Sequence, residues 1–336
     1  MPTFCRHNRL LQNCPICSRE QAVEMRPLVT SSTPRGSEPR PAHKASRGET
    51  RGRSATRSAA SGRGAGAGMR VRRLARGEDD GFRTPLAPGL RSSADAERLA
   101  DELAFAASRL VVLETRPPGL YTEVARAGDV EERTWLAFLI AYLSPLEDSE
   151  DPFGPIEGVR TTWASGELPR LDGVRTGPRT AHDPARGDET LRAFRAWARR
   201  AGSQEASFTG EASWAPERRF DRVFERMALP GLSRDARYEL LVSLGRLGVF
   251  DLRGGRLQLS GDNEPTLAAK RALGIGDPML LERRAGELAA ACGVPLEALD
   301  LGLFNWGTGL RVYSGLPRDE EADPALVEGC RAALGV

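Results

Sequence analysis

The stretch LADELAFAASRLVVLETR, residues 99–116, places leucine, alanine, phenylalanine and valine at the three- and four-residue spacing of an α-helix. Residues 93–97, Ser-Ala-Asp-Ala-Glu, are typical of a helix start, and Pro117-Pro118 ends the helix because proline lacks the N–H that a helix needs. Ordered structure is therefore expected to begin near Ser93.

A second apolar stretch, residues 130–143, is predicted to form a deeply buried helix that ends at Ser144-Pro145. Further helices are predicted over 189–200, 217–227, 233–247, 264–273, 277–292, 295–305 and 324–334. The intervening residues 165–190 are rich in glycine, proline and arginine and are expected to form an excursion on the surface.

One β element is predicted. Residues 250–259, FDLRGGRLQL, alternate apolar and polar side chains around Gly254-Gly255, which is typical of a β-hairpin. The predicted fold class of residues 93–336 is therefore mainly α with one small β-hairpin.

Four soft metal ligands, Cys5, His7, Cys14 and Cys17, lie within thirteen positions at the start of the sequence. Zn²⁺ prefers tetrahedral cysteine and histidine sites, and a Cys-Pro-x-Cys turn lets two thiolates reach one ion. The spacing predicts a zinc-binding element over residues 1–25. The zinc would be structural, because four protein ligands leave no open position; the alternative is an exposed tail of reduced thiols.

Residues 26–92 are rich in Arg, Gly, Ser and Pro and are predicted to form a disordered linker. Residues 1–77 carry 16 Lys and Arg against 4 Asp and Glu, whereas the remainder carries 32 against 42. Such a basic arm indicates an anionic partner, and DNA is the partner expected, bound in a salt-dependent way. The alternative is a linker that only confers solubility.

No apolar stretch is long enough to cross a bilayer, and the N-terminus lacks the apolar core of a signal peptide. Five cysteines would leave one unpaired in a disulfide framework, so reduced thiols are expected. These features predict a cytoplasmic protein without a membrane partner.

The helical body lacks a Gly-x-Gly-x-x-Gly motif, a Walker loop and a Gly-x-Ser-x-Gly motif. His43 and His182 lie in Pro/Gly-rich sequence, which argues against a catalytic triad. Residues 229–236, LPGLSRDA, are more informative, because a Pro-Gly turn before a helix can aim N–H groups at a phosphate. The predicted DNA contacts there are Pro230, Gly231, Ser233 and Arg234. An ordinary turn between two helices would have the same sequence.

Four landmarks occur in an order that resembles the helix-hairpin-helix DNA glycosylase superfamily, over about residues 130 to 310. They are WLAFLIAYLSPLED (135–148), LPGLSRDA (229–236), Asp262 placed nine positions before Arg271, and LGLFNWGTG (301–309). The alpha-glutamyl/putrescinyl thymine pyrophosphorylase-like branch looks like the most similar part of that superfamily. The resemblance implies a base-excision or base-modification enzyme acting at the N-glycosidic bond of a flipped-out, modified base.

The resemblance also implies roles for single residues. Asp262 would be the catalytic carboxylate that stabilises the positively charged sugar, although Glu264 or Asp277 could be its counterpart. An N-cap is the structural alternative for Asp262. Lys270 and Arg271 would contact DNA, and Asn305 with Trp306 would border the base pocket.

The sequence departs from the superfamily pattern at single residues, lacks the four-cysteine cluster loop of some members, and carries a predicted hairpin just before Asp262. Ser233 replaces the second glycine of the hairpin, and Leu146 stands where a base-stack glutamine is expected. Asp235 occupies the position of the Schiff-base lysine, so lyase chemistry is not implied.

The competing class is a non-enzymatic, winged-helix or helix-hairpin-helix DNA-binding protein. Residues 236–259 can be interpreted as a recognition helix followed by a wing. Against this, the body is net acidic and this helix offers only Arg237 and Arg246 to phosphates. A scaffold that binds a protein partner through its zinc element is the third option. Asp262→Asn distinguishes the classes, because only an enzyme would lose turnover while keeping its affinity for DNA.

Overall fold

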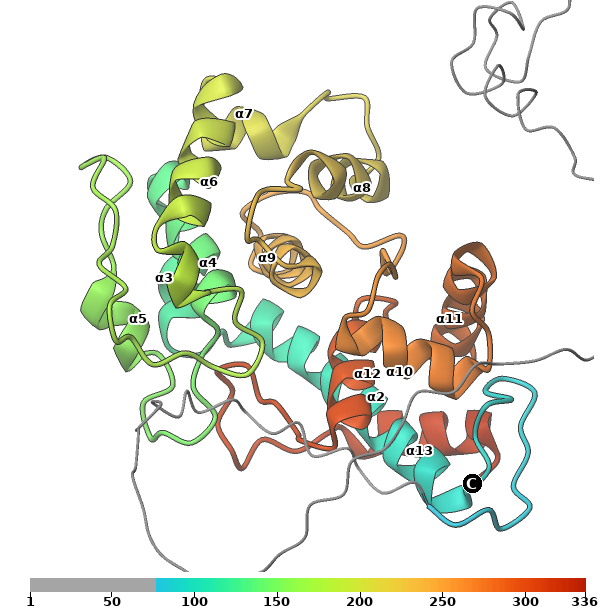
Figure 1. The fold of residues 1–336 in the computed structure, drawn as a ribbon. Helices are drawn as coiled ribbons and strands as arrows, with labels where there is room; N and C mark the ends of the chain where they lie inside the picture. Colours follow the sequence, from blue (N-terminus) through green and yellow to red (C-terminus); the bar gives the residue numbers. More distant parts are fainter. Residues whose placement is uncertain (1–76) are drawn as a thin grey trace, which may run out of the picture. The chain divides into compact units, whose positions relative to one another are not determined.

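In a computed structural model of the chain, residues 77–336 are described. This part of the chain forms helices and no β-strand, so the mainly α class is confirmed (Figure 1). The helices are α2 (Ser93–Thr115), α3 (Leu120–Ala125), α4 (Val130–Leu143), α5 (Gly154–Val159), α6 (Glu189–Arg200), α7 (Gln204–Thr209), α8 (Pro216–Arg226), α9 (Arg234–Arg246), α10 (Glu264–Leu273), α11 (Pro278–Cys292), α12 (Ala298–Thr308) and α13 (Pro324–Leu334), with a 3-10 turn, η2, at Pro184–Arg186.

Helix α2 is the element around which the C-terminal helices pack. It contacts α12 and α13 along its length and also contacts α9 (Figure 1). Close packing against α12 depends on Gly302, because a Cβ atom there would lie 2.8 Å from the Leu103 side chain and 3.0 Å from the Glu102 carbonyl oxygen. The sequence 99–116 therefore forms the helix that its spacing predicts and buries it between distant parts of the chain.

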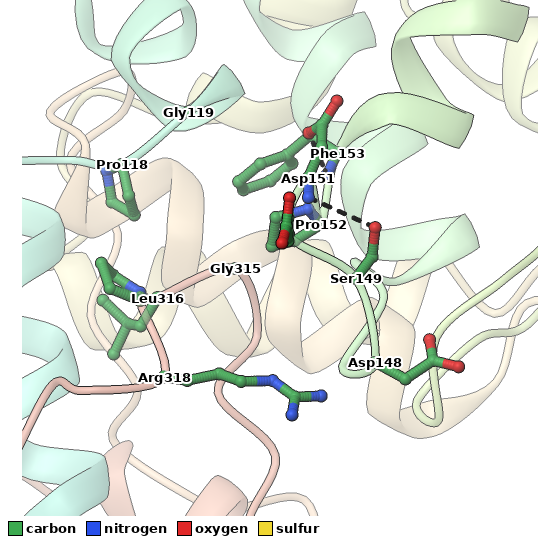
Figure 2. Close-up of a pocket in the computed structure, with 12 residues that line it drawn as sticks. Pro118, Gly119, Asp148, Ser149, Asp151, Pro152, Phe153, Gly315, Leu316 and Arg318 are labelled. Atoms are coloured by element: carbon green, nitrogen blue, oxygen red, sulfur yellow. Dashed lines mark hydrogen bonds between the residues drawn. The ribbon is translucent and has the colours of Figure 1, made fainter.

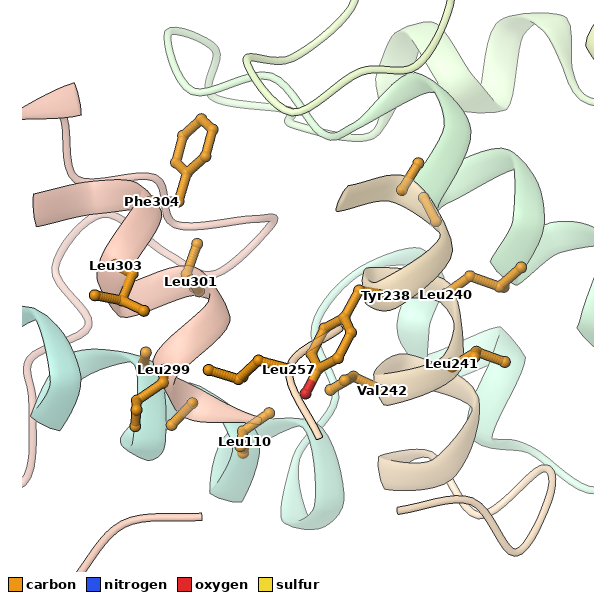
Figure 3. Packing of buried hydrophobic residues seen from close by; sticks show 14 of the residues in the cluster. Leu110, Tyr238, Leu240, Leu241, Val242, Leu257, Leu299, Leu301, Leu303 and Phe304 are labelled. Carbon is orange, nitrogen blue, oxygen red and sulfur yellow. The ribbon is translucent and has the colours of Figure 1, made fainter. Parts of the chain in front are cut away.

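Helix α4 forms the second core element, and it is apolar around nearly its whole circumference, as a buried helix must be. The Phe138 ring stacks on Phe194 of α6 with ring centroids 3.8 Å apart, and Trp135 stacks on Phe138 at 5.5 Å. Helix α9 contacts both α4 and α2 and so connects the two halves of the core. Figure 3 shows the apolar side chains of α9 and α12 on either side of Leu257.

Five buried charged side chains lie between α2, α9, α12 and residue 179, and together they form what we call the central ion cluster. Each is at most 9% exposed: Arg109, Arg179, Arg234, Glu239 and Asp300. Arg109 donates to Glu239 at 2.5 Å, and Arg179 donates to the other Glu239 oxygen at 3.0 Å. Arg179 and Arg234 both donate to Asp300. Arg234 also donates to the adjacent half-buried Asp235 at 3.2 Å, so that three cations meet three carboxylates, and such compensation is the condition for burying them.

The β-hairpin predicted over 250–259 does not form paired strands in the structure. Its amides are bonded to carboxylates of neighbouring helices instead. The N–H groups of Leu257 and Leu259 donate to the two oxygens of Glu282 on α11, at 2.8 and 2.6 Å. Because these amides already have acceptors, and because Gln258 between them is left-handed with φ +58°, the segment is bonded to α11 and forms no ladder.

Two other sequence-based boundaries are corrected. Residues 77–92, which we placed in the linker, pack on the body: Ala87 and Leu90 are buried, and the Gly89 amide donates to the Ala272 carbonyl at 2.9 Å. The excursion predicted at 165–190 has little helix but is not wholly superficial, since Arg179 belongs to the central ion cluster. In both segments a few buried contacts hold the chain in place, and such contacts produce no periodic pattern in the sequence.

The predicted zinc ligands and residues 26–76 of the predicted linker lie outside the described residues. Within residues 77–336, none of the helices combines the length and the apolarity that a bilayer span needs.

Candidate functional site

The Pro230-Gly231 turn contacts the start of α6 through the Pro230 carbonyl and Gly231, while the side chains of Pro230 and Ser233 are exposed. The hydroxyl of Thr190 donates to the Pro230 carbonyl at 3.0 Å, and a Cβ atom on Gly231, whose φ is +73°, would lie 2.2 Å from that hydroxyl oxygen. Ser233 caps α9 by accepting from the Ala236 amide at 3.2 Å. This geometry is that of a capped helix-helix turn, with its carbonyl and glycine covered by α6.

Arg234, predicted to contact DNA, is buried and engaged within the protein. Its guanidinium group donates to Asp300 and to the Leu257 carbonyl, and it stacks over the Tyr238 ring at 4.5 Å. The prediction that it contacts a phosphate is therefore wrong. The physical reason is that the carboxylate of Asp300, 66 positions away, is buried beside it and needs a cationic partner.

The Asp262 side chain is exposed in the turn before α10 and borders none of the cavities described below. The N-cap of α10 is its neighbour Asn263, which accepts from the Thr266 amide at 3.1 Å. The alternative Asp277 caps α11 and accepts from the Leu280 amide at 2.9 Å. The other alternative, half-buried Glu264, is the first residue of α10. None of these three carboxylates lines either of the two cavities at the end of α4.

The structure brings Arg271 and Trp306 together but buries the predicted base pocket. The Arg271 guanidinium lies 4.1 Å from the Trp306 ring centroid, while Trp306 is 2% exposed and donates its indole N–H to the Asp95 carbonyl at 2.9 Å. Asn305 is 1% exposed, and both ends of its amide are bonded within the protein. Lys270 is half-buried, with its amine 3.5 Å from the Gly261 carbonyl. Trp306 and Asn305 therefore stabilise the contact of α12 with α2, and neither offers a surface to a base.

Two cavities lie where the end of α4 meets the loop that follows α12. The Glu147 cavity, of about 510 Å³, is lined by residues from 146–148, 176–180 and 310–318. The Phe153 cavity, of about 640 Å³, is lined by residues from 118–119, 148–153 and 315–318 (Figure 2). Asp148 and Arg318 line both cavities, and Figure 2 shows the Arg318 side chain extended toward the Asp148 side. The two cavities thus form one candidate site with two compartments.

Glu147 is the titratable group with the most unusual environment at this site. Its carboxylate accepts hydrogen bonds from the Tyr313 amide at 2.8 Å and the Ser314 amide at 3.0 Å. Burial raises the pKa of Glu147, and it outweighs the lowering by these two N–H groups and by the charges of Arg109 and Arg318. This carboxyl therefore keeps its proton to a higher pH than an ordinary glutamate does.

The backbone around the Glu147 cavity is strained. Ser144 has φ +59° and Ser314 has φ +49°, two of the three left-handed residues other than glycine within residues 77–336. Gly177 approaches Ser144 closely: its amide donates to the Ser144 carbonyl at 2.9 Å, and a Cβ atom on it would lie 1.9 Å from the Pro145 carbonyl oxygen. Strained conformations of this kind persist where the surroundings fix them, and they cluster at binding sites.

The charges at the site are mixed. Arg318 is exposed and forms no ion pair within the described residues, whereas Arg311 pairs with Glu102 at 2.8 Å. Asp148 pairs with Arg175 at 3.1 Å on the exposed rim. Arg318 is thus the cation at this site that remains open to an anionic group of a ligand.

Glu147 was not singled out from the sequence, although it lies inside the stretch 135–148 that carries the resemblance. The available signal was two adjacent acidic residues, Glu147-Asp148, which follow soon after the Ser144-Pro145 that ends the apolar helix. Its partners lie 166 and 167 positions away, so no local pattern identifies its burial.

Among residues 77–336, no cluster of three or more histidine, cysteine or acidic side chains is arranged to hold a metal. Comparison of the chain with protein-family models, curated proteins and solved structures finds no match in any of the three.

Proposed function

We propose that this protein acts on the N-glycosidic bond of a modified base in DNA, and that Glu147 rather than Asp262 supplies the reacting carboxyl group. One observation carries the proposal: a half-buried carboxyl with a raised pKa forms part of the wall of a cavity of about 510 Å³. The ordered landmarks between residues 130 and 310, which resemble the helix-hairpin-helix glycosylases, support DNA as the substrate.

Cleavage of a glycosidic bond requires a proton for the departing base and stabilisation of a cationic sugar. A carboxyl group with a raised pKa is suited to giving that proton, because its protonated form is populated closer to neutral pH. Once ionised, the same group offers negative charge to the sugar cation, and water then adds to the sugar carbon and returns a proton to the carboxylate. Glu147 is held for both tasks by two backbone N–H groups, which fix the direction of its carboxylate.

The surroundings of Glu147 suit an extruded nucleotide. The base would enter the Glu147 cavity, which Tyr313 and Leu146 also line, because a base within a duplex is inaccessible to the enzyme. Arg318 at the mouth would contact a phosphate. The basic arm would add salt-dependent affinity, and the predicted zinc at Cys5, His7, Cys14 and Cys17 would fold the N-terminal element.

The winged-helix alternative is not favoured by the contacts of α9. Arg237 stacks over Phe224 at 4.3 Å and donates to the carbonyl of that residue at 3.2 Å. Arg246 bonds to Glu114 and Glu297 at 2.5 and 2.7 Å. A recognition helix would present these cations to phosphates, and residues 250–259 form no paired strands to act as a wing.

The test uses the full chain and DNA duplexes that each carry one altered base: uracil, 5-hydroxymethyluracil, hypoxanthine, 8-oxoguanine or a thymine with an amine substituent. Release or exchange of the base is followed by chromatography, and DNA affinity by fluorescence anisotropy. We expect Glu147→Gln to lower turnover by roughly 10²-fold or more, as loss of a general acid does, while affinity stays within about twofold.

Asp262→Asn is the matched control, because it also neutralises one carboxylate but at an exposed position outside the cavities. It should leave turnover unchanged. The proposal is overturned if the Glu147→Gln variant keeps full turnover. It is also overturned if the wild-type protein binds the duplexes but none of them reacts.

A further inference from the structure

The 176–181 segment forms one wall of the Glu147 cavity and contains neither helix nor strand. The residues of this segment that line the cavity are Thr176, Gly177, Pro178 and Thr180. Arg179 lies among them in the sequence but does not line the cavity, because its side chain is 3% exposed and enters the central ion cluster. The position of this wall therefore depends on single contacts rather than on regular secondary structure.

One set of contacts bonds the segment to the end of α4, a few residues before Glu147. The last carbonyl groups of a helix have no partner within the helix, and the segment supplies donors for them. The Gly177 amide donates to the Ser144 carbonyl at 2.9 Å. The Ala181 amide donates to the Tyr142 carbonyl, also at 2.9 Å. The segment and the Glu147 carboxyl thus share the end of α4 as their support.

The Arg179 side chain bonds the same segment to α9 and α12. Its guanidinium donates to Glu239 of α9 at 3.0 Å and to Asp300 of α12. It also lies over the Phe304 ring of α12, 5.2 Å from the ring centroid. Helix α12 leads into residues 310–318, which contribute another part of the cavity wall. Arg179 therefore connects two parts of the wall that are far apart in the sequence.

Buried charge is an unusual means of holding a wall in place. Apolar side chains of similar volume often stabilise a fold at least as well as a buried ion pair does. The Arg179 guanidinium is also incompletely bonded, since its buried Nε has no hydrogen-bond partner among residues 77–336. Hydrogen bonds between charged groups have a defined direction, which apolar contacts lack. The contacts of Arg179 are therefore suited to fixing the wall in one position.

We propose that Arg179 is a positioning residue for the reaction at Glu147, and that it holds the 176–181 segment where a bound nucleotide is aligned with the carboxyl. This inference rests on the proposed function. A displacement of about 1 Å caused by a distant substitution can lower a rate by roughly 10²-fold. Because Arg179 does not line the cavity, its substitution should lower the rate of the reaction and leave the affinity for DNA unchanged.

The test compares Arg179→Met, Arg179→Lys and Leu288→Ala with wild type, each as the full chain. Leu288→Ala is the control for stability, because Leu288 is 1% exposed on α11 and lines neither cavity. Loss of a buried leucine side chain also destabilises a protein, without touching the central ion cluster. The substrate is the duplex that reacts fastest in the base-release test above. Single-turnover rates are measured with the protein in excess, and DNA affinity by fluorescence anisotropy.

We expect Arg179→Met to lower the single-turnover rate by roughly 10²-fold and to keep the DNA affinity within about twofold. Arg179→Lys retains the charge but not the planar fork of donors, so its rate should lie between, roughly tenfold below wild type. Leu288→Ala should keep the wild-type rate. Hydrogen exchange of the 176–181 segment, followed by mass spectrometry, should be faster in Arg179→Met than in Leu288→Ala.

The outcomes separate the two proposals. The role of Arg179 is overturned, and the proposed function stands, if Arg179→Met and Leu288→Ala react at equal rates or if the segment exchanges equally in both. A loss of DNA affinity as large as the loss of rate also overturns the role of Arg179. If Arg179→Met does not fold, Arg179→Lys decides by the same comparisons. A wild-type chain that binds the duplexes and releases no base overturns both proposals.

Discussion

Replacing Arg179 by methionine tests the central ion cluster most directly. The Arg179 side chain is 3% exposed and bridges two buried acids, donating to Glu239 at 3.0 Å and to Asp300. Methionine preserves much of the length and apolar volume of the arginine stem, so the change removes mainly the charge and its two hydrogen bonds. We expect a large loss of free energy of unfolding.

The magnitude follows from three contributions. Two hydrogen bonds between charged groups contribute about 1.5–3 kcal/mol each. Against this, the buried Nε of Arg179 has no hydrogen-bond partner among the described residues, and its removal returns about 1–3 kcal/mol. Glu239 keeps Arg109 as a partner and Asp300 keeps Arg234. The net expected loss is therefore about 3 kcal/mol, at the lower end of the range for a broken buried ion pair.

The assay is urea unfolding of the full chain, followed by tryptophan fluorescence and by circular dichroism. Arg175→Met is the matched control in the same loop, because Arg175 is 63% exposed and pairs with the exposed Asp148 at 3.1 Å. The control should change the free energy of unfolding by less than about 0.5 kcal/mol, as exposed ion pairs usually do.

The same variant should change the pH dependence of stability. Burial alone would raise the pKa of Asp300, but Arg234 and Arg179 outweigh it and hold that pKa below its ordinary value; Glu239 is likewise lowered, by Arg109 and Arg179. Carboxyls with lowered pKa values contribute stability above their unfolded pKa of about 4, and this contribution is lost as the pH falls. In Arg179→Met the loss should begin at a higher pH. A cost no larger than that of Arg175→Met, below about 0.5 kcal/mol, together with an unchanged acid profile, would refute the argument that the cluster stabilises the fold through Arg179.

Three further predictions concern the candidate site and the N-terminus. If Glu147 acts as a general acid, turnover should stay high at pH values above the ordinary pKa of a glutamate and fall as the pH rises through the raised pKa of Glu147. A pH–rate profile without a fall on the alkaline side would contradict this role. Gly177→Ala should destabilise the protein by about 2–3 kcal/mol in urea unfolding, because its Cβ atom would lie 1.9 Å from the Pro145 carbonyl oxygen; an unchanged midpoint would show that the loop yields freely. The purified full chain should contain stoichiometric zinc by elemental analysis, and the Cys14→Ser, Cys17→Ser variant should lack it; metal-free wild-type protein would refute the zinc element.

Much of the helical architecture could be predicted from local sequence. The bounds expected for 130–143, 189–200, 264–273 and 324–334 agree with α4, α6, α10 and α13. In each case an apolar face at helical spacing is enclosed by residues that begin or end a helix, and both signals lie within the segment itself. The six-residue helices α3, α5 and α7 were missed, since so few residues cannot establish a periodicity.

The candidate site was less predictable. Asp262 and Arg234 were selected by spacing and by resemblance, yet one is exposed in a turn and the other is buried in the central ion cluster. The short pattern LPGLSR is compatible both with a phosphate-binding hairpin and with a capped turn. Thr190, which covers the turn, belongs to another helix, and so the distinction could not be read from the pattern.

The sequence by itself determined that the chain after Ser93 is helical, where most of those helices begin and end, and that a basic N-terminal arm is joined to an acidic body. These properties depend on neighbouring residues and on composition. Only the tertiary structure decided which charged groups are available for chemistry, because burial and pKa depend on contacts across the chain: Arg179 meets Asp300 over 121 positions, and Glu147 meets the Tyr313 amide over 166. Those contacts place Arg234 inside the protein, leave Asp262 in solvent, and set the half-buried carboxyl of Glu147 in the wall of a cavity.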